Sequence, residues 1–307
     1  MTPQTRPHRA TRPLTRPARA IALIAAAAAA LLLGQITLTA TPTPTPGDTT
    51  SILLAAAATA RTAPEGAYWR LKQLYTGTAG PYGTTTYRLR TSHLTETWVA
   101  KNGRIWIGHR QLAARPLDLE AWRRDGSPAQ WPMGKDGGLH STTPGQGTLT
   151  RLKGERKLHW SALPLTIKQI EALPADPEAL KKRATEAIGS DRDLAGPAQD
   201  GLPRTLASLL YELPASPQVR SAAYQALATL PAVQVEGAAT DPQGRPGIAV
   251  TFPIQQGQPT QGRLIIDPGT SQVLTYEITR IPHKADQLTT ILESGWTDTR
   301  PSPPSTE

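Results

Sequence analysis

An uncharged, apolar stretch near the N-terminus constrains the chain more than any other feature. It covers residues 20–40 and reads AIALIAAAAAALLLGQITLTA. As a helix it is about 31 Å long, at roughly 1.5 Å per residue, which matches the hydrocarbon thickness of a bilayer. We therefore predict one transmembrane helix over residues 20–40, with the lipid bilayer as its first partner.

The charges on either side of this stretch predict its orientation. Five arginines and no acidic residue precede it, and the first charge after it is Asp48. The positive-inside rule then makes residues 1–19 a cytoplasmic tail and places everything after residue 40 outside the cell membrane. A cleavable signal peptide is the alternative, although Leu38-Thr39-Ala40 has a bulky residue where a cleavage site needs a small one.

Composition excludes several classes of protein. The chain has no cysteine, which rules out a lipoprotein anchor, disulfides, cysteine-ligated zinc and thiol catalysis. Without the five leader arginines, 28 basic residues face 24 acidic ones. Because these basic residues are scattered, we expect no nucleic-acid partner.

Beyond the apolar stretch, the chain begins with a spacer. Residues 41–47 read TPTPTPG, which favours an extended polyproline II linker over residues 41–50. We expect a short helix over residues 51–60, with Ser51 as its N-cap. We predict one extracytoplasmic domain over residues 51–298 and a disordered tail over residues 299–307.

A first group of strands follows the short helix. Alternating polar and apolar residues predict strands at 67–76, 84–92, 93–101 and 104–110. Asn102-Gly103 predicts a type I′ hairpin between the last two, because both central residues of that turn need positive φ. Residues 115–147, rich in glycine, proline and charge, predict a long surface loop.

Helices and a second group of strands complete the pattern. Proline punctuation and N-cap residues predict the helices, with Asp176 and Ser216 as caps, and turn residues separate the later strands. The expected helices are 165–173, 177–188, 204–212 and 217–230, and the expected strands are 233–240, 247–254, 263–267, 272–280 and 290–296. We predict an α+β fold: a curved open antiparallel sheet of two meanders, with the proline-punctuated helices on one face.

Three tryptophans on the first strands are the candidate ligand or partner contacts. Trp69, Trp98 and Trp106 fall on three of these strands. A place in the core or half-buried in the sheet is the competing interpretation for each.

No catalytic constellation is recognisable, so we name no catalytic residue and expect no cofactor and no enzyme activity. The histidines after the apolar stretch lack partners at ligand spacing; they are His93, His109, His140, His159 and His283. Asp191-Arg192-Asp193 and Asp136-Gly137-Gly138 could bind a cation, but exposed charged turns explain them equally well, and we predict no metal site.

Several blocks of the chain resemble a known family. Residues 209–250 read LLYELPASPQVRSAAYQALATLPAVQVEGAATDPQGRPGIAV, and RLIIDPGTSQVL follows at 263–274. With YWR, ETW and LPADPEAL earlier in the chain, they resemble a family of single-span proteins of high-GC Gram-positive bacteria whose function is not established. The resemblance covers nearly all of the chain after residue 50.

The resemblance implies a link to sigma factors and a type of outer domain. Family members are commonly encoded beside an extracytoplasmic-function sigma factor, and their outer part looks distantly like the curved open sheets of lipoprotein carriers and sigma-regulator sensor domains. Ser271 departs from the family, where a Thr-Gly turn is usual. The cytoplasmic tail is also shorter than in relatives. It is too short and polar to bind a sigma factor alone, so coupling to transcription would need a second membrane protein.

Three function classes remain open. The first is an extracytoplasmic sensing or binding domain linked to sigma-factor-associated envelope signalling. The second is a carrier of a hydrophobic or lipid molecule, and the third is an enzyme with an uncommon site. An apolar groove above about 300 Å³ lined by several aromatics would favour the carrier, and convergent polar side chains in a cleft would favour the enzyme.

Overall fold

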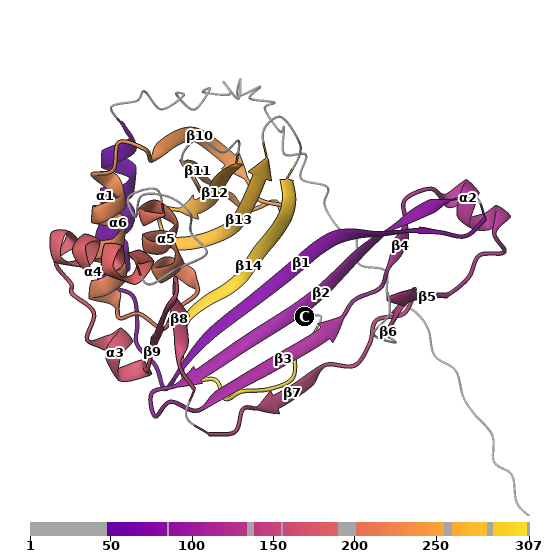
Figure 1. Ribbon diagram of the computed structural model, residues 1–307, viewed down its shortest axis with the longest axis horizontal. Coiled ribbons are helices and arrows are strands. Elements are labelled where there is room, and N and C mark those ends of the chain that lie inside the picture. Colours follow the sequence, from indigo (N-terminus) through magenta and orange to yellow (C-terminus); the bar gives the residue numbers. More distant parts are fainter. Residues whose placement is uncertain are drawn as a thin grey trace, which may run out of the picture. The chain divides into compact units, whose positions relative to one another are not determined.

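One antiparallel sheet contains both predicted meanders. The computed structural model describes residues 48–84, 86–133, 138–154, 156–189, 201–254, 260–280 and 285–305. The main sheet has ten strands in the order β10-β11-β12-β13-β14-β1-β2-β3-β7, with β4 paired to β2, and β5/β6 and β8/β9 form separate hairpins (Figure 1). The strands are β1 Tyr68–Tyr82, β2 Tyr87–Ala100, β3 Ile105–Gln111, β4 Arg115–Pro116, β5 Gln130–Met133, β6 Gly138–Ser141, β7 Thr148–Arg151, β8 Leu158–Trp160, β9 Leu163–Leu165, β10 Gln234–Thr240, β11 Pro246–Pro253, β12 Thr260–Asp267, β13 Gln272–Arg280 and β14 Ala285–Thr297.

The pairing of β1 with β14 joins the two halves of the sheet. It runs antiparallel from Tyr68 opposite Thr297 to Thr76 opposite Leu288, with one bulge after Lys72. The prediction of an α+β fold with a large open antiparallel sheet is confirmed. Strands far apart in sequence therefore share one hydrogen-bonded ladder.

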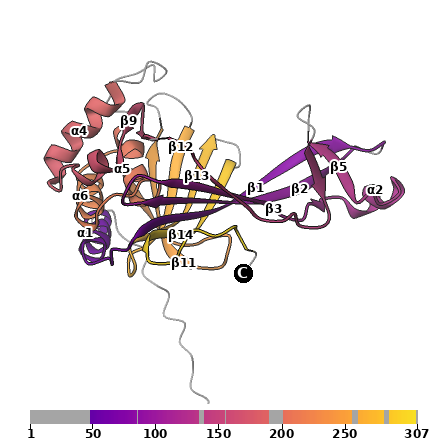
Figure 2. The same cartoon turned by 90° about the horizontal axis from the view of Figure 1, so that it is seen from below.

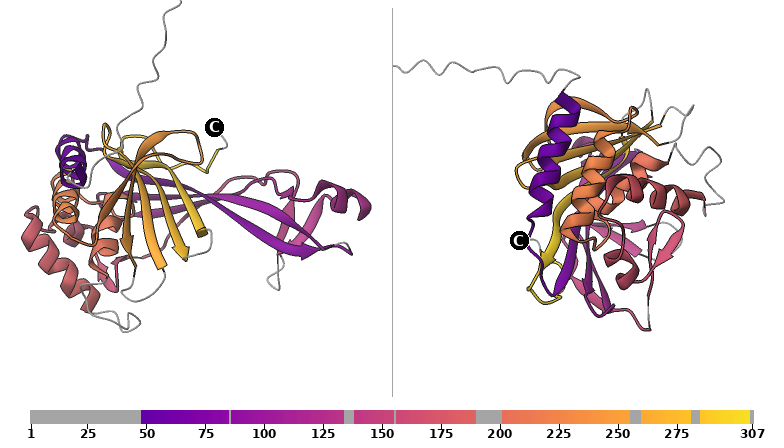
Figure 3. Two further views of the ribbon diagram at one scale, coloured as in Figure 1. Left: turned by 90° about the horizontal axis from the view of Figure 1, so that it is seen from above. Right: turned by 90° about the vertical axis from the view of Figure 1, so that its left-hand side faces the viewer.

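Four helices lie together against one face of the β10–β14 half of the sheet (Figures 1 and 3). All the helices of the described residues are α1 Asp48–Arg61, α2 Leu119–Arg124, α3 Ile167–Glu171, α4 Pro177–Gly189, α5 Leu202–Tyr211 and α6 Pro217–Ala228. The four on this face are α1, α4, α5 and α6. Figure 3 shows α1 and α6 side by side, with α4 and α5 next to them. Leu206 and Leu209 of α5, Leu264 and Val273 of the sheet and Trp69 of β1 belong to the same buried core. Burial of this shared apolar surface holds the helices on the sheet.

The predicted N-cap residue is confirmed for two helices and wrong for one. The Asp176 carboxylate accepts a hydrogen bond from the Ala179 amide at 2.8 Å. The Ser216 hydroxyl accepts one from the Val219 amide at 3.3 Å. Ser51 is not an N-cap, because α1 already begins at Asp48.

Two predicted strands, 84–92 and 93–101, are one strand. β2 runs without interruption from Tyr87 to Ala100, and β1 extends to Tyr82 to pair with it. The predicted break at Ser92-His93 contains neither glycine nor proline, so nothing ends the strand there. The first meander therefore has fewer and longer strands than expected.

The hairpin at Asn102-Gly103 exists, but its turn differs from the predicted type. Gly103 has φ +82°, whereas Asn102 is not in the positive-φ region. The Ala100 amide donates to the Arg104 carbonyl and the Gly103 amide to the Ala100 carbonyl, both at 2.8 Å. This is a three-residue loop that ends with a left-handed glycine, the next commonest hairpin connection after the two-residue turns.

The prediction of a long surface loop over residues 115–147 is wrong. This segment contains β4, α2, β5 and β6, which lie around the far ends of β1 and β2 (Figure 2). We call these four elements and the paired ends of β1 and β2 beyond Gly77 the arm. The arm has its own small core, which includes Leu89, Ala121 and Trp131. The prediction failed because the partners that bury Trp131 come from β2, far away in sequence.

The predictions for the two ends of the chain fall partly outside the described residues. Within the described residues, no helix combines the length and hydropathy that crossing a bilayer requires. The stretch predicted to do so, residues 20–40, lies outside the described residues, as do the tail at 1–19 and most of the linker.

We expected disorder after residue 298. The described part of this C-terminal tail, up to Ser305, contacts the sheet, and Pro304 is buried.

Candidate functional site

The three candidate tryptophans lie on two different faces of the sheet. Trp69 faces the helices, where it is fully buried, with its ring 5.8 Å from that of Trp296 in an edge-on arrangement. Trp98 of β2 is paired with Trp106 of β3, so both rings lie on the opposite face. Trp69 is therefore a core residue on the helix face, whereas Trp98 and Trp106 share the opposite face, where Trp98 is also fully buried and Trp106 is partly exposed.

Trp98 is enclosed by a network of charged side chains. The Arg70 guanidinium lies 4.7 Å from the centre of the Trp98 ring, and the Trp98 indole N–H donates to Glu96 Oε2 at 3.1 Å. Glu96, only 1% exposed, also accepts from Arg70 Nη2 at 3.1 Å and lies 3.8 Å from the Lys72 ammonium. Arg70 also pairs with Glu293 of β14. Two cations compensate the burial of one carboxylate, which fixes the orientation of the Trp98 ring.

Trp106 continues the aromatic surface toward the β2–β3 hairpin. Its ring lies edge-on to Tyr68, with 6.1 Å between the ring centres, and the Arg104 guanidinium lies 5.8 Å from its centre. Trp106 is half-buried, whereas Trp98 is fully buried. We call Tyr68, Trp98 and Trp106 the aromatic face.

The C-terminal tail runs beside β3 (Figure 1). Gly108 of β3 is two residues from Trp106 and therefore lies on the same face of the sheet. A Cβ atom on Gly108 would come within 2.8 Å of the Pro304 ring, and one on Gly147 would collide with the Pro304 carbonyl oxygen. Arg110 Nη1 donates to that same carbonyl oxygen at 3.3 Å. We call Gly108, Arg110 and Gly147 the proline seat.

Sequence reasoning missed the proline seat. A glycine inside a strand can mark close approach of another backbone, so Gly108 in IWIGHRQ was a usable signal. The residues next to Gly108 in the sequence do not indicate that the approaching residue is Pro304. That contact links segments from opposite ends of the domain.

Two histidines expected to stand alone lie together on the helix face. The His93 ring stacks on Tyr75 with 5.0 Å between ring centres, and it is 5.4 Å from the His109 ring. Burial, together with the nearby His109 ring, lowers the pKa of His93. The register of the β2–β3 hairpin places them on adjacent strands, so counting back from Asn102-Gly103 could have found this pair.

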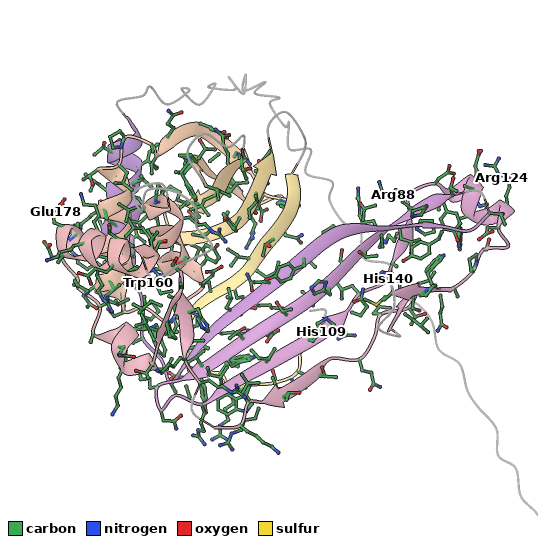
Figure 4. All side chains as sticks on the ribbon, viewed as in Figure 1. Arg88, His109, Arg124, His140, Trp160 and Glu178 are labelled. Carbon is green, nitrogen blue, oxygen red and sulfur yellow. The ribbon has the colours of Figure 1, made fainter. Side chains whose placement is uncertain are left out.

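The remaining histidines and the candidate cation sites form no common site in the part of the chain that the structure describes. Figure 4 shows His109 on β3 and His140 in the arm, where burial lowers the His140 pKa. No group of three or more His, Cys, Asp or Glu side chains within the described ranges could hold a metal ion. His283, Asp191-Arg192-Asp193 and Asp136-Gly137 lie outside those ranges.

Comparison with known proteins shows distant fold similarity to solved structures and no sequence relative. No family of known proteins and no curated protein matches the chain. The structure is distantly similar to that of MucB. The Pseudomonas aeruginosa MucA/MucB complex aligns with TM-score 0.31 at 11% identity, over 81% of this chain and 56% of that one. MucB in complex with MucA(peri) gives TM-score 0.32 at 12% identity over 83% and 57%, and MucB alone gives 0.30 at 12% over 85% and 61%.

The chain thus spans less than two thirds of the length of these MucB chains. Sequence identities and TM-scores this low show nothing about function. The residues of this chain must therefore carry any functional proposal.

Proposed function

We propose that this chain is a non-enzymatic, membrane-anchored extracytoplasmic binding domain. In this proposal, the aromatic face and the proline seat bind an extended, proline-containing segment of a partner protein. The observation that carries it is Pro304: the chain's own tail, RPSPPS at residues 300–305, already occupies the seat.

The geometry of the seat supports the proposal that it binds an extended segment with proline. Gly108 and Gly147 remove the side chains that would otherwise collide with the ring and carbonyl of Pro304. Arg110 supplies a donor to the carbonyl oxygen, a contact available to any backbone in that position. Proline-rich segments are extended before they bind, so they lose little conformational entropy, and aromatic surfaces are their usual recognition partners.

The tail in this proposal is an intramolecular occupant that a partner displaces. A second membrane protein is the partner class we propose. The short cytoplasmic tail at 1–19 and the sigma-factor gene neighbourhood of the resembling family both support a partner of this kind.

A carrier of hydrophobic molecules is not favoured. A pocket of about 440 Å³ at the hairpin end of β2 and β3 is lined mostly by polar or basic residues and by no aromatic side chain. A lipid carrier needs a mainly apolar lining.

Binding of the tail in trans tests the proposal. A chain ending at Asp298 should bind a fluorescently labelled peptide of residues 297–307, and the intact chain should bind it more weakly because its own tail competes. Gly108→Ala in the shortened chain should abolish most of the binding, because the new methyl group lies where the Pro304 ring packs.

The matched control is Gly77→Ala on β1, where a Cβ has no atom within 4 Å. It should leave peptide affinity unchanged. If the shortened chain fails to bind the peptide, or if both glycine variants bind it as well as the parent does, the proposal is wrong.

The location has its own test. A phosphatase fused after Glu307 should be active and a fluorescent reporter of cytoplasmic location dark, since the domain is proposed to lie outside the membrane. The reverse pattern would contradict the orientation, and a mature N-terminus near residue 41 would show cleavage.

A further inference from the structure

A basic pocket lies at the hairpin end of β2 and β3, next to α3. Its volume is about 440 Å³, within the range of small-molecule sites. Five of its lining residues are cationic and none is acidic. The cationic residues are Lys101, Arg104, Arg151, Arg156 and Lys168.

Little negative charge offsets these cations in the described part of the chain. Lys101 pairs with Glu65 at 3.0 Å. Arg104 Nε donates instead to the neutral Asn102 Oδ1 at 3.1 Å, and Arg156 Nε donates to the Lys153 carbonyl at 3.1 Å. For Arg151 and Lys168, both exposed, the described residues show no ion pair. Converging cations repel one another, so a bound anion would relieve this repulsion.

The backbone leaves room for a ligand between these side chains. Gly103 and Gly154 both line the pocket, with φ of +82° and +73°. A Cβ on either would have no atom within 4 Å, so the space above both turns is open. A ligand can therefore approach the backbone between the cationic side chains.

We propose that this basic pocket binds a ligand that carries phosphate groups. Arginine guanidinium groups present forked donors that match phosphate oxygens, and lysine adds a point charge. The volume exceeds that of a single phosphate ion, so the expected ligand is a diphosphate or a phosphate-bearing headgroup. The phosphate can belong to a soluble compound or to an anionic lipid.

The pocket is separate from the proline seat and does not depend on the function proposed above. Arg104 contacts Trp106, and Arg151 lies opposite Trp106 in the β3–β7 ladder, so both reach the aromatic face. The test therefore leaves both in place and changes Arg156 and Lys168, which contact neither the aromatic face nor Pro304 in the described structure.

Calorimetric titration of the full chain in detergent, at about 0.15 M salt, tests the proposal. Two ligands separate the sources of phosphate: inorganic pyrophosphate, and glycerophosphoglycerol, the headgroup of phosphatidylglycerol without its acyl chains. Binding of pyrophosphate alone assigns a soluble ligand, and binding of glycerophosphoglycerol assigns a lipid headgroup. Binding of neither overturns the proposal.

The double variant Arg156→Gln/Lys168→Gln should weaken binding roughly tenfold or more, because it removes two charge-assisted contacts. The matched control is Arg123→Gln/Arg124→Gln on α2 in the arm, where Figure 4 shows Arg124. This control changes the net charge of the protein by the same amount. The control should bind as the parent does. Equal weakening of both double variants would show a nonspecific effect of net charge and overturn the site.

Discussion

Ser271 holds a backbone conformation that serine rarely adopts. Its φ is +56°, and its hydroxyl is buried with no hydrogen-bond partner among the described residues. Its carbonyl oxygen accepts from the Tyr224 hydroxyl at 3.0 Å and from Arg220 Nη2 at 3.4 Å, which ties the β12–β13 turn to α6. The turn is therefore fixed by its carbonyl rather than by its side chain. The glycine of the resembling family suits the same position.

Ser271→Gly should stabilise the protein by about 1 kcal/mol, because glycine adopts positive φ without strain and the unpartnered hydroxyl disappears. The carbonyl contacts to α6 remain. Urea unfolding measures the change. Ser127→Gly, at φ +54° in an exposed turn, should stabilise less, since no buried hydroxyl is lost there. A lower stability for Ser271→Gly would contradict this account of the turn.

The lowered pKa of His93 predicts a pH dependence of stability. Burial and the neighbouring His109 hold the pKa of His93 in the folded state below its value in the unfolded chain, which is near 6.5. Since the unfolded state then binds more protons, the free energy of unfolding should fall as the pH decreases through about 6.5. His140, whose pKa burial also lowers, acts in the same direction.

His93→Gln should reduce this loss of stability between about pH 7.5 and 5. His159→Gln, at an exposed position, should leave it unchanged. Denaturant unfolding at a series of pH values gives the slope of the free energy of unfolding against pH for each protein. Identical slopes for the parent and for His93→Gln would refute the assignment.

At the scale of elements, the arm is held by a small core of its own. The Trp131 indole N–H donates to the Tyr87 hydroxyl at 2.8 Å, and Asp125 connects α2 to Tyr87 and Thr84. Trp131→Ala should destabilise the arm by on the order of 3 kcal/mol while the ten-stranded sheet stays folded.

Hydrogen exchange resolves this effect by segment. Amides of β5, β6 and α2 should exchange faster in Trp131→Ala, and those of β11 and β12 should not change. Leu139→Ala is the control in the same segment, because Leu139 is 52% exposed. Uniformly faster exchange across the sheet would show that the arm and the sheet unfold together.

Elements with local signals could be predicted from the sequence, and those with distant partners could not. Asp176 and Ser216 identify helix starts through residues three positions away, so both helices were predicted correctly. The arm was missed because Trp131 is buried by residues of β2. The proline seat was missed because Gly108 meets Pro304 from the other end of the domain. Of the three predicted contact residues, Trp69 and Trp98 are fully buried and only Trp106 is partly exposed, so their role as ligand or partner contacts stays a prediction.

At the scale of the whole molecule, the shared sheet predicts cooperative unfolding. The β1–β14 ladder and the common core under the helices make each meander depend on the other. Residues 41–307, which include all of α1, should unfold in urea in a single transition when followed by the helical circular dichroism signal. Two resolved transitions, or a stable proteolytic fragment ending near Leu213, would instead indicate two domains.

We propose that the tail and a partner segment compete for the aromatic face and the proline seat. The chain has no cysteine, so Ser305→Cys carries a single fluorescent label next to Pro304. The anisotropy of this label in the intact chain is the most direct measurement. It should be high at first and fall when an unlabelled peptide of residues 297–307 is added in excess, but not when the peptide has alanine in place of its prolines. Low anisotropy before any peptide is added, or no change at saturating peptide, would contradict the account.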